Sequence, residues 1–192
     1  MKTETVAHAQ TLFAFLREMD KYTAVLRQIW TEEGRQESDA EHSWQLAMML
    51  LALQPHLTGI DLHRALKMAL VHDLPELYCG DVFTYDEKGR EGKKEREAAA
   101  AEKLFGKMPG TDLHALWIEF EANETPEAKI VQALDKLHPI LQNTYNGGKS
   151  WRKHGITLAQ IRKKKDSYMQ VHPVIQELYE WTLREAQQHG LR

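Results

Sequence analysis

Four residues of this chain have the side chains and the spacing needed to hold a divalent metal ion. Two are histidines and two are aspartates: His42, His72, Asp73 and Asp135. Each stands among apolar residues at helical spacing, so its side chain would point toward an interior, where an imidazole or a carboxylate is costly without a partner. Imidazole nitrogens and carboxylate oxygens are common ligands of divalent transition metals. The four residues therefore predict one metal centre.

Helical periodicity is what would bring these side chains together. His42 lies on the buried stripe of a helix expected over about residues 39–54. The apolar members of that stripe are Leu46, Met49 and Leu53. Adjacent residues on a helix diverge by about 100°, so His72 and Asp73 can reach one ion only if their helix ends there. Pro75 supplies that end.

Each of the four residues also has an ordinary explanation when it is taken alone. A histidine on an apolar stripe is usually a hydrogen-bonded core residue, and a mid-helix aspartate beside a lysine, as Asp135 is beside Lys136, is usually solvated. A His-Asp pair occurs by chance in many chains. Three helices that each offer such a group at an inward position give the metal centre the same weight as these explanations.

Two further carboxylates, Glu76 and Asp81, follow the His-Asp pair closely. Metal-assisted hydrolysis needs a group that moves protons, and a carboxylate that does not bind the metal is suited to this role. The alternatives are a glutamate at a helix start and an aspartate in a turn. Arg27, expected near the end of the first helix, has a guanidinium that suits a phosphate; its alternative is a surface arginine.

The elements that must position these residues are predicted to be helices. Apolar residues recur at helical spacing along almost the whole chain, and start and stop signals divide it into about eight helices with no strand pattern. The first is expected over about residues 5–30. Thr125-Pro126 predicts the start of another, and the last is expected over residues 173–189, closed by Gly190. The fold class is therefore all-α.

Composition gives no sign of a nucleic-acid or membrane partner. The chain of 192 residues has 25 basic and 28 acidic residues, a net charge of −3, and no apolar run approaches the roughly 20 residues that span a bilayer. We expect one domain over residues 1–192, with its core over about residues 10–175. A single cysteine, Cys79, excludes an internal disulfide and favours the reducing cytoplasm.

A short basic run, Arg162 to Lys165, is the feature that would best suit a nucleic acid. It lies in a helical segment and is followed by an aspartate. We interpret it as a solvated helix face rather than a binding surface.

The order of the four candidate ligands, H … HD … D, resembles the signature of the HD-domain metal hydrolases. Four longer blocks are similar to those of the HD-domain 5′-deoxynucleotidase-like hydrolases: ESDAEHSWQLAMM, ALVHDLPELYCGD, ETPEAKIVQALDKL and LQNTYNGGKSWRKHGIT. The resemblance covers about residues 10–175. It implies an all-helical, commonly dimeric protein that removes phosphate from deoxyribonucleoside 5′-monophosphates with a divalent transition metal.

The resemblance also implies a role for each candidate residue. It makes the ligands of one divalent ion the residues His42, His72, Asp73 and Asp135. Glu76 and Asp81 match two catalytic carboxylates, and Arg27 and Arg35 match arginines that bind the substrate. The ligand types leave the metal open among Mn, Co, Zn, Fe, Ni and Mg.

We therefore expect a cytoplasmic, homodimeric phosphohydrolase whose substrate is a small-molecule phosphate ester. The simplest expectation is a 5′-nucleotidase for ribo- or deoxyribonucleoside 5′-monophosphates. Gln28 stands where nucleotidases can carry a bulkier residue, which leaves the sugar preference open. One alternative is another phosphate ester, such as a cyclic nucleotide or a nucleoside triphosphate. The other is a non-catalytic metal-binding helical module.

Overall fold

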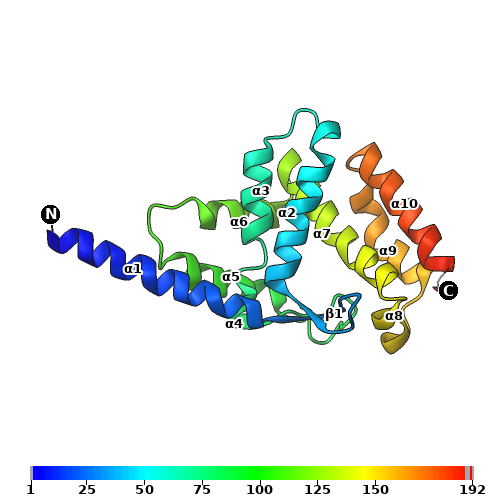
Figure 1. Ribbon diagram of the computed structural model, residues 1–192, viewed down its shortest axis with the longest axis horizontal. Helices are drawn as coiled ribbons and strands as arrows, with labels where there is room; N and C mark the ends of the chain where they lie inside the picture. Colours follow the sequence, from blue (N-terminus) through cyan, green and yellow to red (C-terminus); the bar gives the residue numbers. More distant parts are fainter. Residues whose placement is uncertain (1, 189–190, 192) are drawn as a thin grey trace.

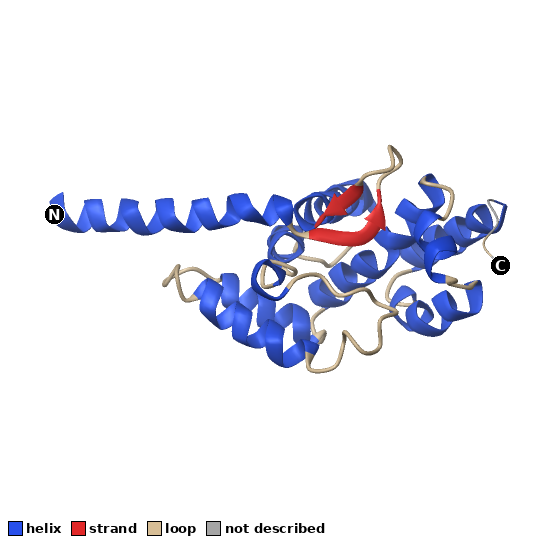
Figure 2. Cartoon of the chain, turned by 90° about the horizontal axis from the view of Figure 1, so that it is seen from below, coloured by secondary structure: helices blue, strands red, loops and turns tan. Residues whose placement is uncertain are grey.

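The N-terminal helix stands apart from the rest of the chain. The computed structural model describes residues 2–188 and 191. Helix α1 (Lys2–Asp20) projects from the body of the molecule in both views (Figures 1 and 2). A 3-10 turn, η1 (Lys21–Ala24), follows it. The expectation of one helix over residues 5–30 is therefore wrong at its C-terminal end.

The chain next forms a small β-hairpin that the sequence pattern did not indicate. Strand β1 (Leu26–Trp30) pairs antiparallel with β2 (Gln36–Ser38). Burial alternates along β1, with Arg27 and Ile29 facing inward, which is the period of a strand rather than of a helix. The expectation of no strand was wrong because five residues are too few to separate the two periods. Arg27 consequently lies on a strand, not on the first helix.

Two helices and a short turn of helix carry the residues around the His-Asp pair. Helix α2 (Asp39–Leu53) begins with a capping box between Ser38 and Glu41, and a 3-10 turn, η2 (Gln54–His56), follows it. Helix α3 (Leu62–Val71) ends just before the pair, as expected, and α4 (Glu76–Cys79) begins after Pro75.

The remaining helices build the second half of the molecule. In chain order they are α5 (Lys93–Phe105), α6 (Leu113–Ala122), α7 (Pro126–Tyr145), α8 (Lys149–His154), α9 (Leu158–Met169) and α10 (Pro173–Gln188). Thr125 caps α7, with proline at its first position, as predicted. The expected end of the last helix at residue 189, with Gly190 closing it, lies outside the described residues.

Helix α7 is the centre of the main core. It packs against α2, α3, α6, α9 and α10 and contributes fully buried residues such as Leu134 and Leu137, each worth about 1.5–3 kcal/mol relative to exposure. A second apolar cluster joins the end of α1 to α5 and α6 through Phe15, Leu104 and Trp117. Two cores therefore meet near α2, α3 and α4.

The all-α expectation is confirmed. In the described part of the chain, eight helices have ten residues or more, and the two-stranded hairpin is a minor addition. Along α1, however, the expected apolar stripe is mostly unburied: Leu12 is 39% and Leu16 57% exposed. Within residues 2–188, no helix is both long and apolar enough to cross a membrane.

Candidate metal centre

The four predicted ligands meet at one point. His42 is on α2, His72 and Asp73 follow α3, and Asp135 is in the middle of α7. One nitrogen or oxygen atom from each of the four lies within 4.8 Å of all the others. His42 Nε2 is 3.2 Å from Asp135 Oδ1 and 3.7 Å from Asp73 Oδ2. These separations are short enough for one ion to touch all four side chains.

The local hydrogen bonds fit a metal at this point. His72 Nδ1 donates to the carbonyl of Ala69 at 2.9 Å, which leaves the lone pair of Nε2 free. That Nε2 atom is fully buried and makes no hydrogen bond with a described residue, although Asp73 Oδ2 is 3.1 Å away. An orphaned nitrogen with its tautomer fixed by a carbonyl is typical of a metal-binding histidine. The ligand types suit a divalent transition metal without choosing one.

Burial and nearby charges place three of the four candidate ligands in the protonation state that binds a metal. Burial, with a contribution from the nearby Arg27 guanidinium, lowers the pKa of His42 to about 4, so its imidazole is neutral. Burial raises the pKa of Asp135, but Lys136 and His42 outweigh it and hold that pKa well below the usual range. The pKa of Asp73 is also lowered, since His72 outweighs burial. Both aspartates are therefore ionised, as metal ligands must be.

His72 behaves differently before a metal arrives. Burial acts to lower its pKa, but the carboxylate of Asp73 raises it overall. Without an ion, Asp73 therefore favours the protonated form of His72, and a divalent ion bound through Nε2 would release that proton.

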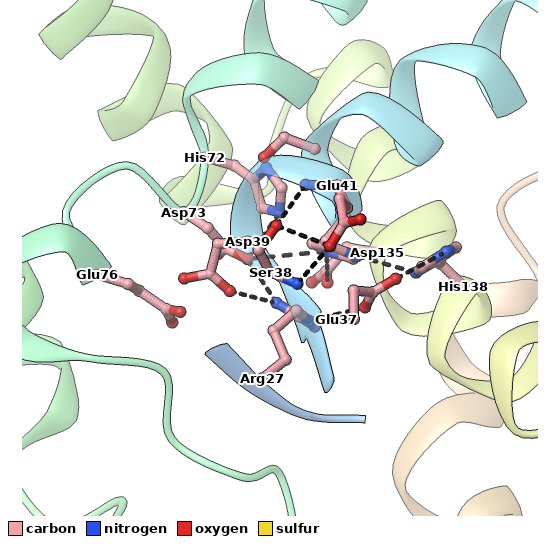
Figure 3. Close-up of polar contacts among 12 residues, drawn as sticks. Arg27, Glu37, Ser38, Asp39, Glu41, His72, Asp73, Glu76, Asp135 and His138 are labelled. Atoms are coloured by element: carbon pink, nitrogen blue, oxygen red, sulfur yellow. Dashed lines mark hydrogen bonds and ion pairs between the residues drawn. The ribbon is translucent and has the colours of Figure 1, made fainter. Parts of the chain in front are cut away.

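A layer of buried residues behind the ligands was missed by sequence reasoning. His138, one turn after Asp135 on α7, has its Nδ1 2.9 Å from His42 Nδ1. Glu37 Oε1 lies 3.6 Å from His138 Nε2 and accepts a hydrogen bond from Gln142. Figure 3 shows the contact between Glu37 and His138 beside the ligands. The spacing Asp135, His138, Gln142 along one helix face was the signal in the sequence for this layer.

Arg27 is buried beside the metal ligands. Its guanidinium lies 3.1 Å from Asp73, 3.4 Å from Asp39 and 3.3 Å from Glu37. The alternative of a surface arginine is therefore wrong, because the period of β1 points this side chain inward. Asp39, the first residue of α2, was also missed; burial raises its pKa to about 7 despite Arg27.

Glu76 lies on the side of Asp73 that faces away from His138 (Figure 3). One oxygen each of Glu76, Asp73 and Asp39 lie within 4.8 Å of one another. Lys93 on α5 contacts Glu76 Oε1 at 3.1 Å, while the buried Oε2 has no hydrogen-bond partner in the described chain. Burial and the charge of Asp73 raise the pKa of Glu76 well above its ordinary value. The sequence could not have indicated Lys93, which is 17 residues away.

Asp81 and Arg35 occupy different surroundings. Asp81 lines a cavity next to Arg27. Burial acts to lower the pKa of Arg27, but the negative charge of Asp81 and of other nearby carboxylates raises it overall. Arg35 is not brought to the metal ligands: it precedes β2 and pairs at the surface with Glu41 of the α2 capping box. The placement of Arg35 is set by the hairpin turn between β1 and β2.

A cavity adjoins the centre through Arg27, although none of the four candidate metal ligands is among the residues that line it. It has a volume of about 50 Å³ and extends from Arg27 and Asp81 between β1, α7, α8 and α9. Its apolar lining includes Phe83, Tyr85 and Trp151. Aromatic surfaces with a few polar groups are typical of small-molecule sites. We refer to this space as the aromatic cavity.

Lys165, which lines the aromatic cavity, contradicts part of the expectation of a solvated helix face. Lys165 belongs to the basic run that we interpreted as a solvated helix face. Arg162, Lys163 and Lys164 are at least partly exposed, but Lys165 is only 4% exposed and lines the aromatic cavity. Lys165 lies four residues after Ile161 and four before Met169, so it shares the buried face of α9 with them.

Comparison with known proteins settles the family. A model of the HD domain matches residues 19–177. The chain belongs to the HD-domain family. It is 34% identical over 139 residues to 5′-deoxynucleotidase HDDC2 of Bos taurus and 32% identical to that of Homo sapiens. Each alignment covers 70% of this chain and 67% of the relative.

A solved structure supports the same assignment. A predicted metal-dependent phosphohydrolase from Magnetospirillum magnetotacticum is 35% identical, with a TM-score of 0.86 over 95% of this chain and 94% of its own. The expected resemblance to HD-domain hydrolases is therefore confirmed. The four candidate ligands could together hold one metal ion.

Proposed function

We propose that this HD-domain protein is a metal-dependent 5′-nucleotidase that releases phosphate from ribo- or deoxyribonucleoside 5′-monophosphates. The observation that carries the proposal is the convergence of four ligand atoms within 4.8 Å, next to Arg27 and the aromatic cavity. The names of the relatives, 5′-deoxynucleotidases from several eukaryotes, support the substrate class. We further propose that one domain spans residues 1–192.

In this proposal the four ligands hold one divalent transition ion. When bound, such an ion supplies positive charge next to a phosphoryl group and makes water more acidic. Arg27 lies 3.1 Å from Asp73, so a phosphate at the centre would be within reach of its guanidinium. Arg27 would offset charge on the phosphoryl oxygens as the ester bond breaks.

Glu76 has the properties of a proton donor. Burial and Asp73 raise its pKa well above the ordinary value although Lys93 acts to lower it, which favours the protonated form that could pass a proton to the leaving 5′ oxygen. Asp81, at the mouth of the aromatic cavity beside Arg27, is placed to orient water or the sugar. We assign Arg35 to the start of α2, where it binds Glu41, and not to contact with the phosphate.

The decisive experiment is a phosphate-release screen with each candidate metal. The substrates would be all ribo- and deoxyribonucleoside 5′-monophosphates, with cyclic nucleotides and nucleoside triphosphates in the same panel. We expect turnover of monophosphates, its loss in Asp73→Ala together with metal binding, and no change in the control Asp20→Ala, whose side chain is exposed. Turnover in Asp73→Ala equal to that of the unaltered protein would refute the assignment.

Two other outcomes of the screen select the alternatives. Release only from cyclic nucleotides or triphosphates would keep the metal chemistry and change the substrate. A purified protein with no metal and no turnover across the panel would favour the non-catalytic metal-binding module.

We also propose that the protein is a cytoplasmic homodimer. Its support is the apolar surface of α1, where Phe13 is 69% and Leu16 57% exposed on a helix that projects from the body (Figure 1). A second copy would remove this surface from water. Phe13→Glu with Leu16→Glu should halve the mass measured by light scattering, while Gln10→Glu should not. A monomeric unaltered protein would contradict the proposal.

A further inference from the structure

Lys165 is a buried cation without a partner. Its side chain lies on the inward face of α9 with Ile161 and Met169, and it lines the aromatic cavity together with Arg27. Among the described residues none forms a hydrogen bond or ion pair with its Nζ, and Nζ is not one of the fully buried unpaired atoms, so it opens into the cavity. The other lysines near the centre are paired: Lys136 with Asp135 and Lys93 with Glu76. Lys165 therefore stands out as an uncompensated charge.

Burying the charged ammonium of Lys165 costs free energy, and the positive charges nearby increase that cost. Burial, together with the nearby cations Lys136 and Arg27, lowers the pKa of Lys165 to about 7, although Asp135 acts to raise it. Three cations from three different elements are thus held near one another. Proteins seldom bury an unpaired ammonium unless it binds something.

An ordinary structural role does not account for this lysine. A lysine that only covers apolar surface extends its ammonium into bulk water, whereas Lys165 is 4% exposed. A lysine that stabilises the fold would contact a carbonyl or a carboxylate, as Lys164 contacts the carbonyl of Thr84. The ammonium of Lys165 contacts the aromatic cavity instead.

We propose that Lys165 is a substrate-binding residue whose ammonium donates to the phosphoryl oxygens of the ester held beside Arg27 and the metal ligands. The inference rests on the proposed function and extends it, because it assigns a second cation to the phosphate. The part of the ester next to the phosphate would enter the aromatic cavity, which Phe83, Tyr85 and Trp151 line.

A phosphoryl group suits this position better than a nucleobase. A base offers neutral acceptors, which a neutral donor can bind without burying a charge. A phosphate dianion offsets several cations at once, so the repulsion among Lys165, Lys136 and Arg27 becomes attraction to a common partner. A bound phosphate would thereby offset the free-energy cost of burying the Lys165 ammonium near two other cations.

The test compares Lys165→Met with Lys165→Arg and with Lys163→Met, a matched control on the exposed face of α9. The probe is inorganic phosphate, measured by calorimetry on the metal-loaded full chain and as a competitive inhibitor of nucleotide turnover. We expect Lys165→Met to weaken phosphate binding and to raise the KM of the nucleotide by about ten- to hundredfold, the value of a charged hydrogen bond. Lys165→Arg should restore part of the affinity, and Lys163→Met should change neither quantity.

Several results would overturn the inference. Unchanged phosphate affinity in Lys165→Met would do so, and so would a loss restricted to nucleotides of particular bases, which would place Lys165 on the base. Metal content is measured in parallel and must stay at the level of the unaltered protein, so that a loss of phosphate binding is not a loss of metal. If Lys165→Met does not fold, Lys165→Gln provides a second neutral variant. If the unaltered protein hydrolyses no nucleotide, the proposed function fails, but the phosphate titration still decides the role of Lys165.

Discussion

The Nδ1 atoms of His42 and His138 lie 2.9 Å apart in the core, so one of them must carry the proton between them. His42 directs Nε2 toward Asp135 and Asp73, and an imidazole that binds a metal through Nε2 keeps its proton on Nδ1. His42 then donates and His138 accepts, which leaves the proton of His138 on Nε2, facing Glu37. A chain of three side chains thus fixes the orientation of one ligand.

His138 should therefore control metal affinity without touching the metal. His138→Phe keeps a ring of similar size but loses the acceptor, and we expect it to weaken binding of the divalent ion by about 10–100-fold. His138→Gln, whose amide oxygen can accept, should recover part of that loss. Competition with a chelator that reports free metal measures both. Equal affinity in His138→Phe and the unaltered protein would show that His42 is fixed by packing alone.

Glu76 should separate turnover from metal binding. Glu76→Gln keeps the shape of the side chain but has no proton to donate, and general-acid catalysis is worth about 10²–10⁴-fold. We expect kcat to fall within that range while the metal content and the KM stay close to those of the unaltered protein. Metal content is measured by elemental analysis. Loss of metal in Glu76→Gln would make Glu76 a ligand instead.

Arg27 should matter to stability as well as to activity. It is buried among Asp73, Asp39 and Glu37, and removal of one partner leaves buried charges uncompensated. Arg27→Ala should lower the free energy of unfolding by about 3–5 kcal/mol, as measured by urea denaturation. Arg35→Ala is the control, because Arg35 is exposed and its pair with Glu41 is screened by solvent; its effect should be small.

Lys165 should give the metal-free protein a specific pH dependence. Its folded pKa, about 7 because of burial, lies below the ordinary lysine pKa of 10.5, so between these values the unfolded chain binds more protons than the folded one. Stability then rises with pH across this window, by up to about 1.4 kcal/mol per pH unit. Below the folded pKa both states are protonated and the full cost of burial remains.

The comparison with Lys165→Met isolates this contribution from other titrating groups. In chelator-treated samples, Lys165→Met should be more stable than the unaltered protein near about pH 6, and the difference should shrink toward about pH 9. Urea unfolding followed by tryptophan fluorescence measures both proteins. A difference that stays constant over that interval would mean that Lys165 keeps its proton in the folded state.

Much of the fold was predictable because its signals are local. The cap at Thr125 with Pro126 fixed the start of α7, and the break at Pro75 placed the end of α3 next to the His-Asp pair. The hairpin was not predictable, since the five residues of β1 fit both periods and its pairing with β2 is a tertiary contact. The buried position of Lys165 was hidden for a similar reason, because the neighbouring residues in its run are more exposed.

The sequence by itself determined the ligand types, the helices that carry them and the family resemblance, because chemistry and helical period are properties of neighbouring residues. Only the tertiary structure decided which charges surround those ligands. Arg27, His138, Lys93 and Lys165 reach the centre from four different elements, and their protonation and partners depend on burial in a shared interior. Burial of that kind arises only when distant segments pack together.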